Sequence, residues 1–131
     1  MNKKIVIGTC LMALAATSMF AQKKGKEGKV LNIYVWNDEF TSRFNDYYAS
    51  KLPKDVKVNF IQTPNQNNAY QDKLDEALLK QSKAKADDKI DIFLVEADYA
   101  LKYVDSPYAL DVMKDIGLKK KDLANQFQYT K

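Results

Sequence analysis

The sequence predicts an α/β fold in which helices cover both faces of a parallel sheet. Three short runs rich in β-branched and aromatic residues stand at 30–35, 56–62 and 90–95, and such runs are typical of strands. Segments with helical periodicity separate them. Strands that alternate with helices of this length run parallel, and they predict a three-layer βαβαβα arrangement.

The first predicted strand, 30–35, leads into a helix over about 38–50. Phe40, Phe44 and Tyr48 recur at a spacing of four residues. Residues four apart lie above one another on a helix, so these three side chains form one apolar face. This face predicts that the helix packs on the sheet.

The second and third predicted strands differ in their patterns. Residues 56–62 alternate apolar with polar side chains, which indicates one exposed face and a strand at the sheet edge. A helix is predicted over about 69–86, and Tyr70, Leu74, Ala77 and Leu78 recur on one face of it as an apolar stripe. The run at 90–95 is almost continuously apolar, which favours a strand buried on both faces. The strand order 2-1-3 places the alternating strand at an edge.

Polar residues stand directly before each predicted helix and can cap it, because a side-chain oxygen there can accept from a free backbone amide. The last apolar residues of the chain are scattered, and they predict only a further short helix over 122–127. The candidate caps are Asn37 or Asp38, Asn67 or Asn68, and Asp98 for a short helix over 99–104.

Residues 1–21 have the layout of a secretory signal peptide. Lys3 and Lys4 precede an apolar run at 5–20, and the small residue Ala21 follows it. The run is shorter than the roughly 20 residues that a spanning helix needs. We therefore expect export to a periplasmic or extracellular location, with cleavage after Ala21. A retained N-terminal anchor is the alternative.

The single cysteine, Cys10, lies inside this apolar run. A lipoprotein interpretation, with Cys10 as the lipidated residue, would leave about five apolar residues before it, too few for the apolar region of a signal. The processed chain is then expected to have no cysteine and no disulfide, so its stability depends on packing.

The net charge of +4 comes from the N-terminal part of the chain. Of 21 basic and 17 acidic residues, six basic and one acidic residue precede position 30, which leaves 15 basic and 16 acidic residues in 30–131. Residues 22–29 are expected to form a basic flexible linker, and 30–131 the folded part. A nucleic-acid binder carries its basic excess on the domain itself, so no nucleic-acid partner is predicted.

The chain has no histidine, which excludes a Ser-His-Asp or Cys-His arrangement and a His-ligated zinc site within it. It also has no glycine-rich phosphate loop. The sequence predicts no catalytic residue, no metal and no cofactor, and a binding protein rather than an enzyme. Carboxylates around positions 38 and 96 keep a glycoside hydrolase open as an alternative.

Open parallel sheets bind ligands outside the carboxyl ends of their strands. The side chains predicted there combine aromatic rings, carboxylates and amides. Sugars suit this set, because their hydroxyls need donors and acceptors and their C–H faces stack on rings. The alternative roles are helix capping for the two aspartates and packing for the two rings. The predicted ligand-binding residues are Trp36, Asn37, Asp38, Glu39, Asn65, Glu96, Asp98 and Tyr99.

Three segments, LNIYVWNDEF, VKVNFIQTPNQNNAYQDKLDEALL and KIDIFLVEADYALKYVDSPYALDV, together resemble the N-terminal lobe of extracellular solute-binding proteins of ABC transporters. The resemblance is to the carbohydrate-binding branch, which includes the maltose-binding type. In that family a D-I-F strand ends in a loop where an aspartate and an aromatic residue face the cleft, as 90–93 and 96–99 match here. The resemblance implies a sugar ligand and a membrane permease as partners.

The chain departs from that family in length, because members are much longer and fold into two lobes. We therefore expect an incomplete first lobe of a two-lobed periplasmic-binding-protein fold, carrying one side of a cleft. Weak affinity is expected from one side alone, and an unfinished sheet edge is expected to pair with other chains. A polyamine or another small solute, or a ligand-free α/β adaptor, are the alternatives.

Overall fold

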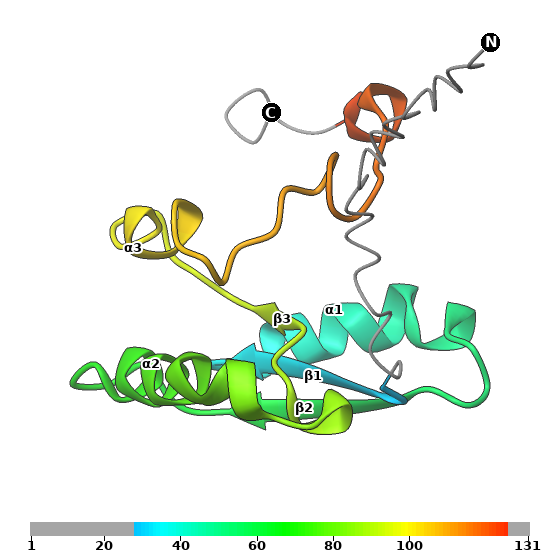
Figure 1. Cartoon of the computed structure of the whole chain (residues 1–131). Helices are drawn as coiled ribbons and strands as arrows, with labels where there is room; N and C mark the ends of the chain where they lie inside the picture. The colour runs from blue at the N-terminus through cyan, green and yellow to red at the C-terminus, as the bar shows by residue number, and fades with distance from the viewer. Residues whose placement is uncertain (1–27, 126–131) are drawn as a thin grey trace, which may run out of the picture.

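The structure is a computed structural model that describes residues 28–125. The predicted signal peptide with Cys10, the linker before residue 28, and the end of the helix predicted over 122–127 lie outside the described residues. The helices and strands, in chain order, are β1 (Val30–Val35), α1 (Glu39–Tyr47), β2 (Lys57–Gln62), α2 (Ala69–Lys80), β3 (Ile92–Phe93) and α3 (Leu101–Val104) (Figure 1).

The three strands form one parallel sheet in the order β2-β1-β3, with the first strand of the chain in the middle. This confirms the predicted α/β class and the predicted order. All six residues of β1 pair with β2, whereas only Ile33 and Tyr34 pair with the two residues of β3. The β1–β2 side of the sheet is therefore extensively paired, whereas the β1–β3 side is short.

Helix α1 packs on one face of the sheet. Ile33 and Val35 of β1 are fully buried there against Phe44 of α1. The ring of Phe44 meets the ring of Phe60 on β2 edge-on, with centroids 5.5 Å apart. Phe44 thus packs on the sheet as predicted, whereas Tyr48, predicted on the same face, follows the end of α1 and is 58% exposed.

Helix α2 packs on the opposite face and completes the three layers (Figure 1). Tyr70, Leu74 and Leu78 form its buried stripe, together with Ile90 and with Tyr103 of α3. Successive residues of a strand point to opposite faces, so β1 contributes to both clusters. One helix on each face is the arrangement predicted for a doubly covered parallel sheet.

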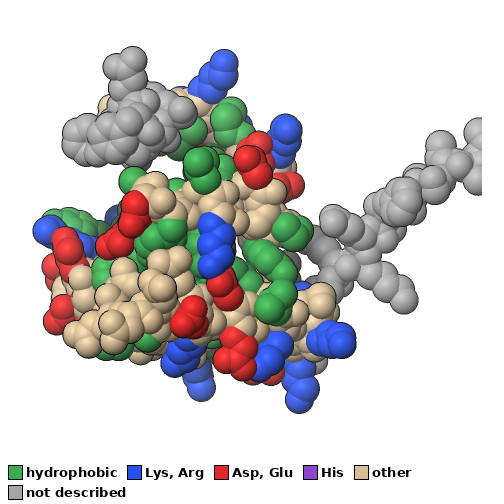
Figure 2. All heavy atoms as spheres, turned by 90° about the vertical axis from the view of Figure 1, so that its left-hand side faces the viewer, with side chains coloured by type: hydrophobic (Ala, Val, Ile, Leu, Met, Phe, Trp, Pro, Cys, Tyr) green, Lys and Arg blue, Asp and Glu red, His purple; other side chains and the backbone are tan. Residues whose placement is uncertain are grey.

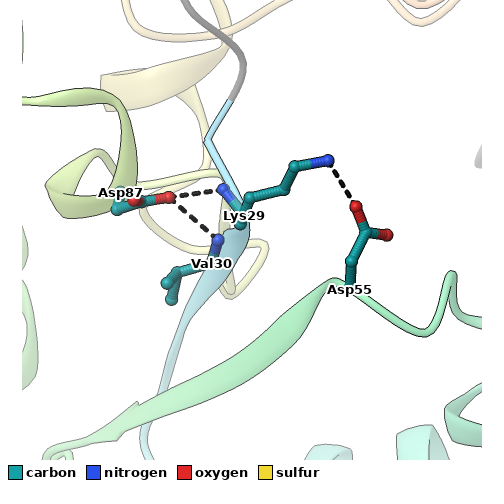
Figure 3. A network of polar contacts seen from close by, with 4 residues as sticks. All are labelled: Lys29, Val30, Asp55 and Asp87. Atoms are coloured by element: carbon teal, nitrogen blue, oxygen red, sulfur yellow. Dashed lines mark hydrogen bonds and ion pairs between the residues drawn. The ribbon is translucent and has the colours of Figure 1, made fainter.

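The amino end of β1 is held by side chains from two other parts of the chain (Figure 3). The Asp87 carboxylate accepts from the backbone N–H groups of Lys29 and Val30. The Lys29 ammonium pairs with Asp55 at 2.6 Å, and this hydrogen bond lowers the pKa of the Asp55 carboxyl. Lys29, the last residue of the predicted linker, thus lies at the start of the sheet.

A buried amide ties the middle strand to the segment before β3. Asn32 is only 5% exposed, and its Nδ2 donates to the backbone oxygens of Asp87 and Lys89, both at 2.8 Å. Its Oδ1 accepts from Asn59 Nδ2 on β2 at 2.9 Å. Buried polar groups are costly unless bonded, so these bonds allow Asn32 to lie beneath this segment.

The helices end earlier than their periodicity predicts. Helix α1 stops at Tyr47 and α2 at Lys80, rather than near 50 and 86. Gln81 explains the end of α2, because its side chain bonds the backbone of Ile90 in both directions, at 2.8 and 2.9 Å. The following segments are short 3₁₀ turns, Ala49–Lys51 after α1, and Gln81–Lys83 and Ala86–Asp88 after α2.

The predicted helix caps are mostly wrong in detail. Asp38 and Asn68 precede α1 and α2, but neither side chain makes a cap hydrogen bond. The backbone of Asn68 has the left-handed conformation, with φ at 62°. The Asn37 side chain instead accepts from the Glu39 amide at 3.1 Å. Helix α3 begins at Leu101 after Ala100, so Asp98 does not cap it. In the described part of the helix predicted over 122–127, Asp122 and Leu123 end a 3₁₀ turn, Lys120–Leu123.

A strand does form within 90–95, but the predicted length and the predicted burial on both faces are wrong. Only Ile92–Phe93 are paired, and Ile92 and Val95 remain 38% and 37% exposed. Among the described residues β3 has one neighbouring strand, β1. Burial on both faces requires cover from further elements, and residues 28–125 supply it only in part.

We term the segment 101–118 the apolar arm. It begins with α3, whose Tyr103 ring packs on Phe93 of β3 with centroids 5.5 Å apart, and the chain then runs away from the sheet (Figure 1). Figure 2 views the side where α2 and α3 lie and shows hydrophobic side chains at the surface there. Within residues 28–125, no helix is long and apolar enough to cross a membrane. The exposed large apolar residues of the arm are Leu101, Val104, Tyr108, Leu110, Val112, Met113, Ile116 and Leu118.

Candidate functional site

The predicted binding residues follow the carboxyl ends of the three strands. Because the strands are parallel, the loops 36–38, 63–68 and 94–100 leave the sheet at one edge, which we term the carboxyl edge. These loops bring an indole, amides and carboxylates to the same edge of the sheet. All of these side chains come from the loops and none from the helices. The topology therefore gathers side chains as far apart in sequence as Trp36 and Tyr99.

Asn65 and Glu96 are brought into direct contact. Asn65 Nδ2 donates to Glu96 Oε2 at 3.3 Å, and both side chains are exposed. Asn65 follows β2 and Glu96 follows β3, so this bond spans the sheet over the end of β1. It leaves the second carboxylate oxygen of Glu96 and the amide oxygen of Asn65 as acceptors for a ligand.

Trp36 is half-buried, so its ring packs against the core and can also contact a ligand. Its ring meets the ring of Tyr70 edge-on, with centroids 5.3 Å apart and an interplanar angle of 89°. The ring is packed on one side by the core and retains exposed surface elsewhere. An aromatic ring fixed in this way can present a flat apolar surface to a sugar.

Tyr99 covers the end of β3 more than it faces solvent. It is half-buried, and its ring packs edge-on to Tyr103 at 6.2 Å. Its hydroxyl is buried without a hydrogen-bond partner among the described residues. Burial raises the pKa of this hydroxyl, and the charges of Glu96 and Asp98 raise it further. Tyr99 can therefore donate a hydrogen bond at neutral pH.

The remaining predicted residues are less engaged. Asn37 is half-buried and bonds its own loop. Asp38, Glu39 and Asp98 are exposed, and within the described residues their carboxylates form no hydrogen bond or ion pair. The structure thus joins Asn65 with Glu96 directly, whereas these three acids contribute charge at the same edge.

The carboxyl edge is acidic throughout. The three loops contain two aspartates and one glutamate, Glu39 follows at the start of α1, and none of the loops contains a lysine or arginine. Like charges repel an anionic ligand from such an edge. The edge therefore suits a neutral polyhydroxylated ligand or a cation. No group of three or more potential metal ligands occurs among residues 28–125.

Two hollows within the described residues lie away from the carboxyl edge, and neither is lined by a predicted binding residue. One, of about 410 Å³, lies on the sheet face over Asn32 and Asn59. The other, of about 230 Å³, lies between α2 and the apolar arm. Its lining residues are Asp75, Leu78, Leu79, Lys102, Tyr103, Ser106 and Tyr108.

Tyr70 is a residue of this region that the sequence predicts only as part of an apolar stripe. Its side chain is fully buried, and its hydroxyl lies 2.8 Å from the Leu94 carbonyl oxygen and 3.1 Å from that of Tyr34. The only sequence signal was a hydroxyl-bearing ring at the start of an otherwise aliphatic stripe.

Comparison with known proteins gave no match, whether to a family model, to a curated protein or to a solved structure.

Proposed function

We propose that this chain is the substrate-binding component of an ABC-type uptake system and captures a sugar or oligosaccharide at its carboxyl edge. The observation that carries the proposal is that the half-buried Trp36 and the Asn65–Glu96 hydrogen bond follow the ends of neighbouring parallel strands at one edge of the sheet. Ring, amide and carboxylate are the groups that a sugar needs.

The resemblance of the sequence to the N-terminal lobe of solute-binding proteins supports the same proposal. In such a protein the carboxyl edge is one wall of a cleft, and a second lobe supplies the other. The exposed apolar arm suits a unit that is completed by further protein surface. The proposed partner is a membrane permease that receives the captured ligand.

A titration of the full chain with neutral oligosaccharides, read by calorimetry, tests the proposal. We expect weak but saturable binding, and we expect Trp36→Ala and Glu96→Ala each to abolish it. Glu76→Ala is the matched control, because Glu76 is also an exposed glutamate with one hydrogen-bond partner, Lys80, but lies on α2. Unchanged affinity in both site variants would refute the site.

A cationic ligand is the second candidate, and the acidic character of the carboxyl edge favours it. A polyamine would depend on Glu39, Glu96 and Asp98 rather than on the indole of Trp36. The same titration with a polyamine separates the two candidates. Binding that weakens with added salt and survives Trp36→Ala would assign the cation instead of the sugar.

We also propose that the chain is exported and processed after Ala21. The support is the order of basic, apolar and small residues in 1–21. Mass determination of the chain recovered outside the cytoplasm is expected to show an N-terminus at Gln22. Recovery of an uncleaved chain in the membrane fraction would favour the retained anchor.

A further inference from the structure

Tyr70 connects the ends of two strands at the carboxyl edge. Its hydroxyl donates to the Leu94 carbonyl oxygen at 2.8 Å, lies 3.1 Å from the Tyr34 carbonyl oxygen, and accepts from the Leu94 amide at 3.1 Å. Leu94 directly follows β3, and Tyr34 is the last residue of β1 but one. One buried hydroxyl therefore joins the main chains of both strands.

These contacts lie close to the proposed ligand groups. Trp36 stands two residues after Tyr34, and Glu96 stands two residues after Leu94. The ring of Tyr70 also supports the Trp36 ring directly, edge-on at 5.3 Å. Tyr70 thus contacts one side of the site through its ring and the other side through its hydroxyl.

The β3 side of the site has few other fixed points. Its ladder with β1 covers two residues. A backbone hydrogen bond flanks it on each side, from the Asp91 N–H to the Asn32 carbonyl oxygen at 3.1 Å and from the Leu94 N–H to the Tyr34 carbonyl oxygen at 3.2 Å. A short ladder at a sheet edge opens easily. The Tyr70 hydroxyl adds bonds at the end from which Glu96 projects.

We infer that Tyr70 is a positioning residue that sets the separation between Trp36 and Glu96, and hence the affinity of the site. The inference rests on the proposed function, because it takes these two residues to bind the ligand. Binding groups act only when a supporting shell holds their geometry. Tyr70 itself is fully buried and does not touch the ligand.

The test compares Tyr70→Phe with Tyr103→Phe in the full chain. Tyr103 is a matched control, because it lies in the same buried cluster and its hydroxyl bonds the Asp75 side chain rather than a strand end. Trp36 is the only tryptophan, so acrylamide quenching of its fluorescence reports on the site without a ligand. Amide hydrogen exchange at Leu94 reports on the end of β3.

We expect Tyr70→Phe, and not Tyr103→Phe, to increase quenching of Trp36 and to speed exchange of the Leu94 amide about tenfold. We also expect it to weaken binding of the best neutral oligosaccharide about tenfold, a loss of roughly 1.4 kcal/mol. Equal quenching and equal exchange in the two variants would overturn the inference, even if a sugar binds.

The two proposals can fail separately. Absence of any ligand for the unmodified chain would refute the proposed function, while quenching and exchange would still decide the role of Tyr70. If Tyr70→Phe does not fold, NMR of the unmodified chain replaces it. A slowly exchanging Tyr70 hydroxyl proton close to the Leu94 amide is expected, and its absence would overturn the inference.

Discussion

Tyr34, Tyr70, Tyr99 and Tyr103 pack together on the α2 side of the sheet. Among them, the Tyr70 hydroxyl bonds the backbone and the Tyr103 hydroxyl bonds the Asp75 side chain. Burial is the first cause that raises the pKa of Tyr34, Tyr70, Tyr99 and Tyr103 above its ordinary value. The shift is largest for Tyr70, whose hydroxyl bonds Leu94 and whose side chain has no exposed surface. Because their pKa values are higher in the folded chain, the free energy of unfolding depends on pH in the alkaline range.

The free energy of unfolding is expected to fall as the pH rises above about 10. In the unfolded chain tyrosines ionise near pH 10, whereas the folded chain keeps Tyr70 neutral to higher pH. The stability is therefore complete below the unfolded pKa and is lost as the pH rises toward the folded pKa, by about 1.4 kcal/mol per pH unit for each such tyrosine.

Urea unfolding at pH 8 and pH 11 measures this loss. Tyr70→Phe is expected to reduce the difference between the two pH values, and Tyr47→Phe, with an exposed side chain, is expected to leave it unchanged. A free energy of unfolding that is the same at both pH values would contradict the expectation.

At the scale of elements, local patterns predicted what depends on local contacts. β2 alternates and lies at an edge, α1 shows one apolar face and packs through Phe44, and the order 2-1-3 follows from the contrast between strands. The end of α2 was missed because Gln81 bonds Ile90, a contact to the far side of a turn. Periodicity within a helix carries no information about such a bond.

The candidate site shows the same division. That Asn65 and Glu96 meet follows from parallel strands, because their carboxyl ends share an edge. That Tyr70 reaches Leu94 depends on the depth and rotation of α2, which the sequence pattern does not specify. The apolar run at 90–95 predicted a longer strand than the two residues of β3. The length of a strand depends on the elements that pack on it, and the run itself carries no information about them.

At the scale of the whole molecule, unpaired surfaces lie at both edges of the sheet and on the apolar arm. In the described residues β2 and β3 each pair only with β1, so both sheet edges carry free backbone groups. The apolar arm adds large exposed side chains, of which Leu101 is 82% exposed. Exposed apolar surface of this kind marks a place of contact with other protein.

The full chain is therefore expected to self-associate through the apolar arm, with a sedimentation coefficient that rises with protein concentration. Ile116→Lys is expected to suppress the rise, because it removes an exposed apolar side chain and adds a charge. Asn125→Lys adds the same charge without removing apolar surface, and it serves as the control. A chain that stays monomeric at every concentration would contradict the expectation.

The first strand of the chain is also the middle strand of the sheet, and this order has a consequence for synthesis. During translation β1 emerges well before β2, and its second neighbour, β3, is complete only at residue 93. The β1–β3 pairing joins positions 59 apart, and such distant pairings form slowly. A nascent chain with this topology therefore cannot complete its sheet before residue 93 has been made.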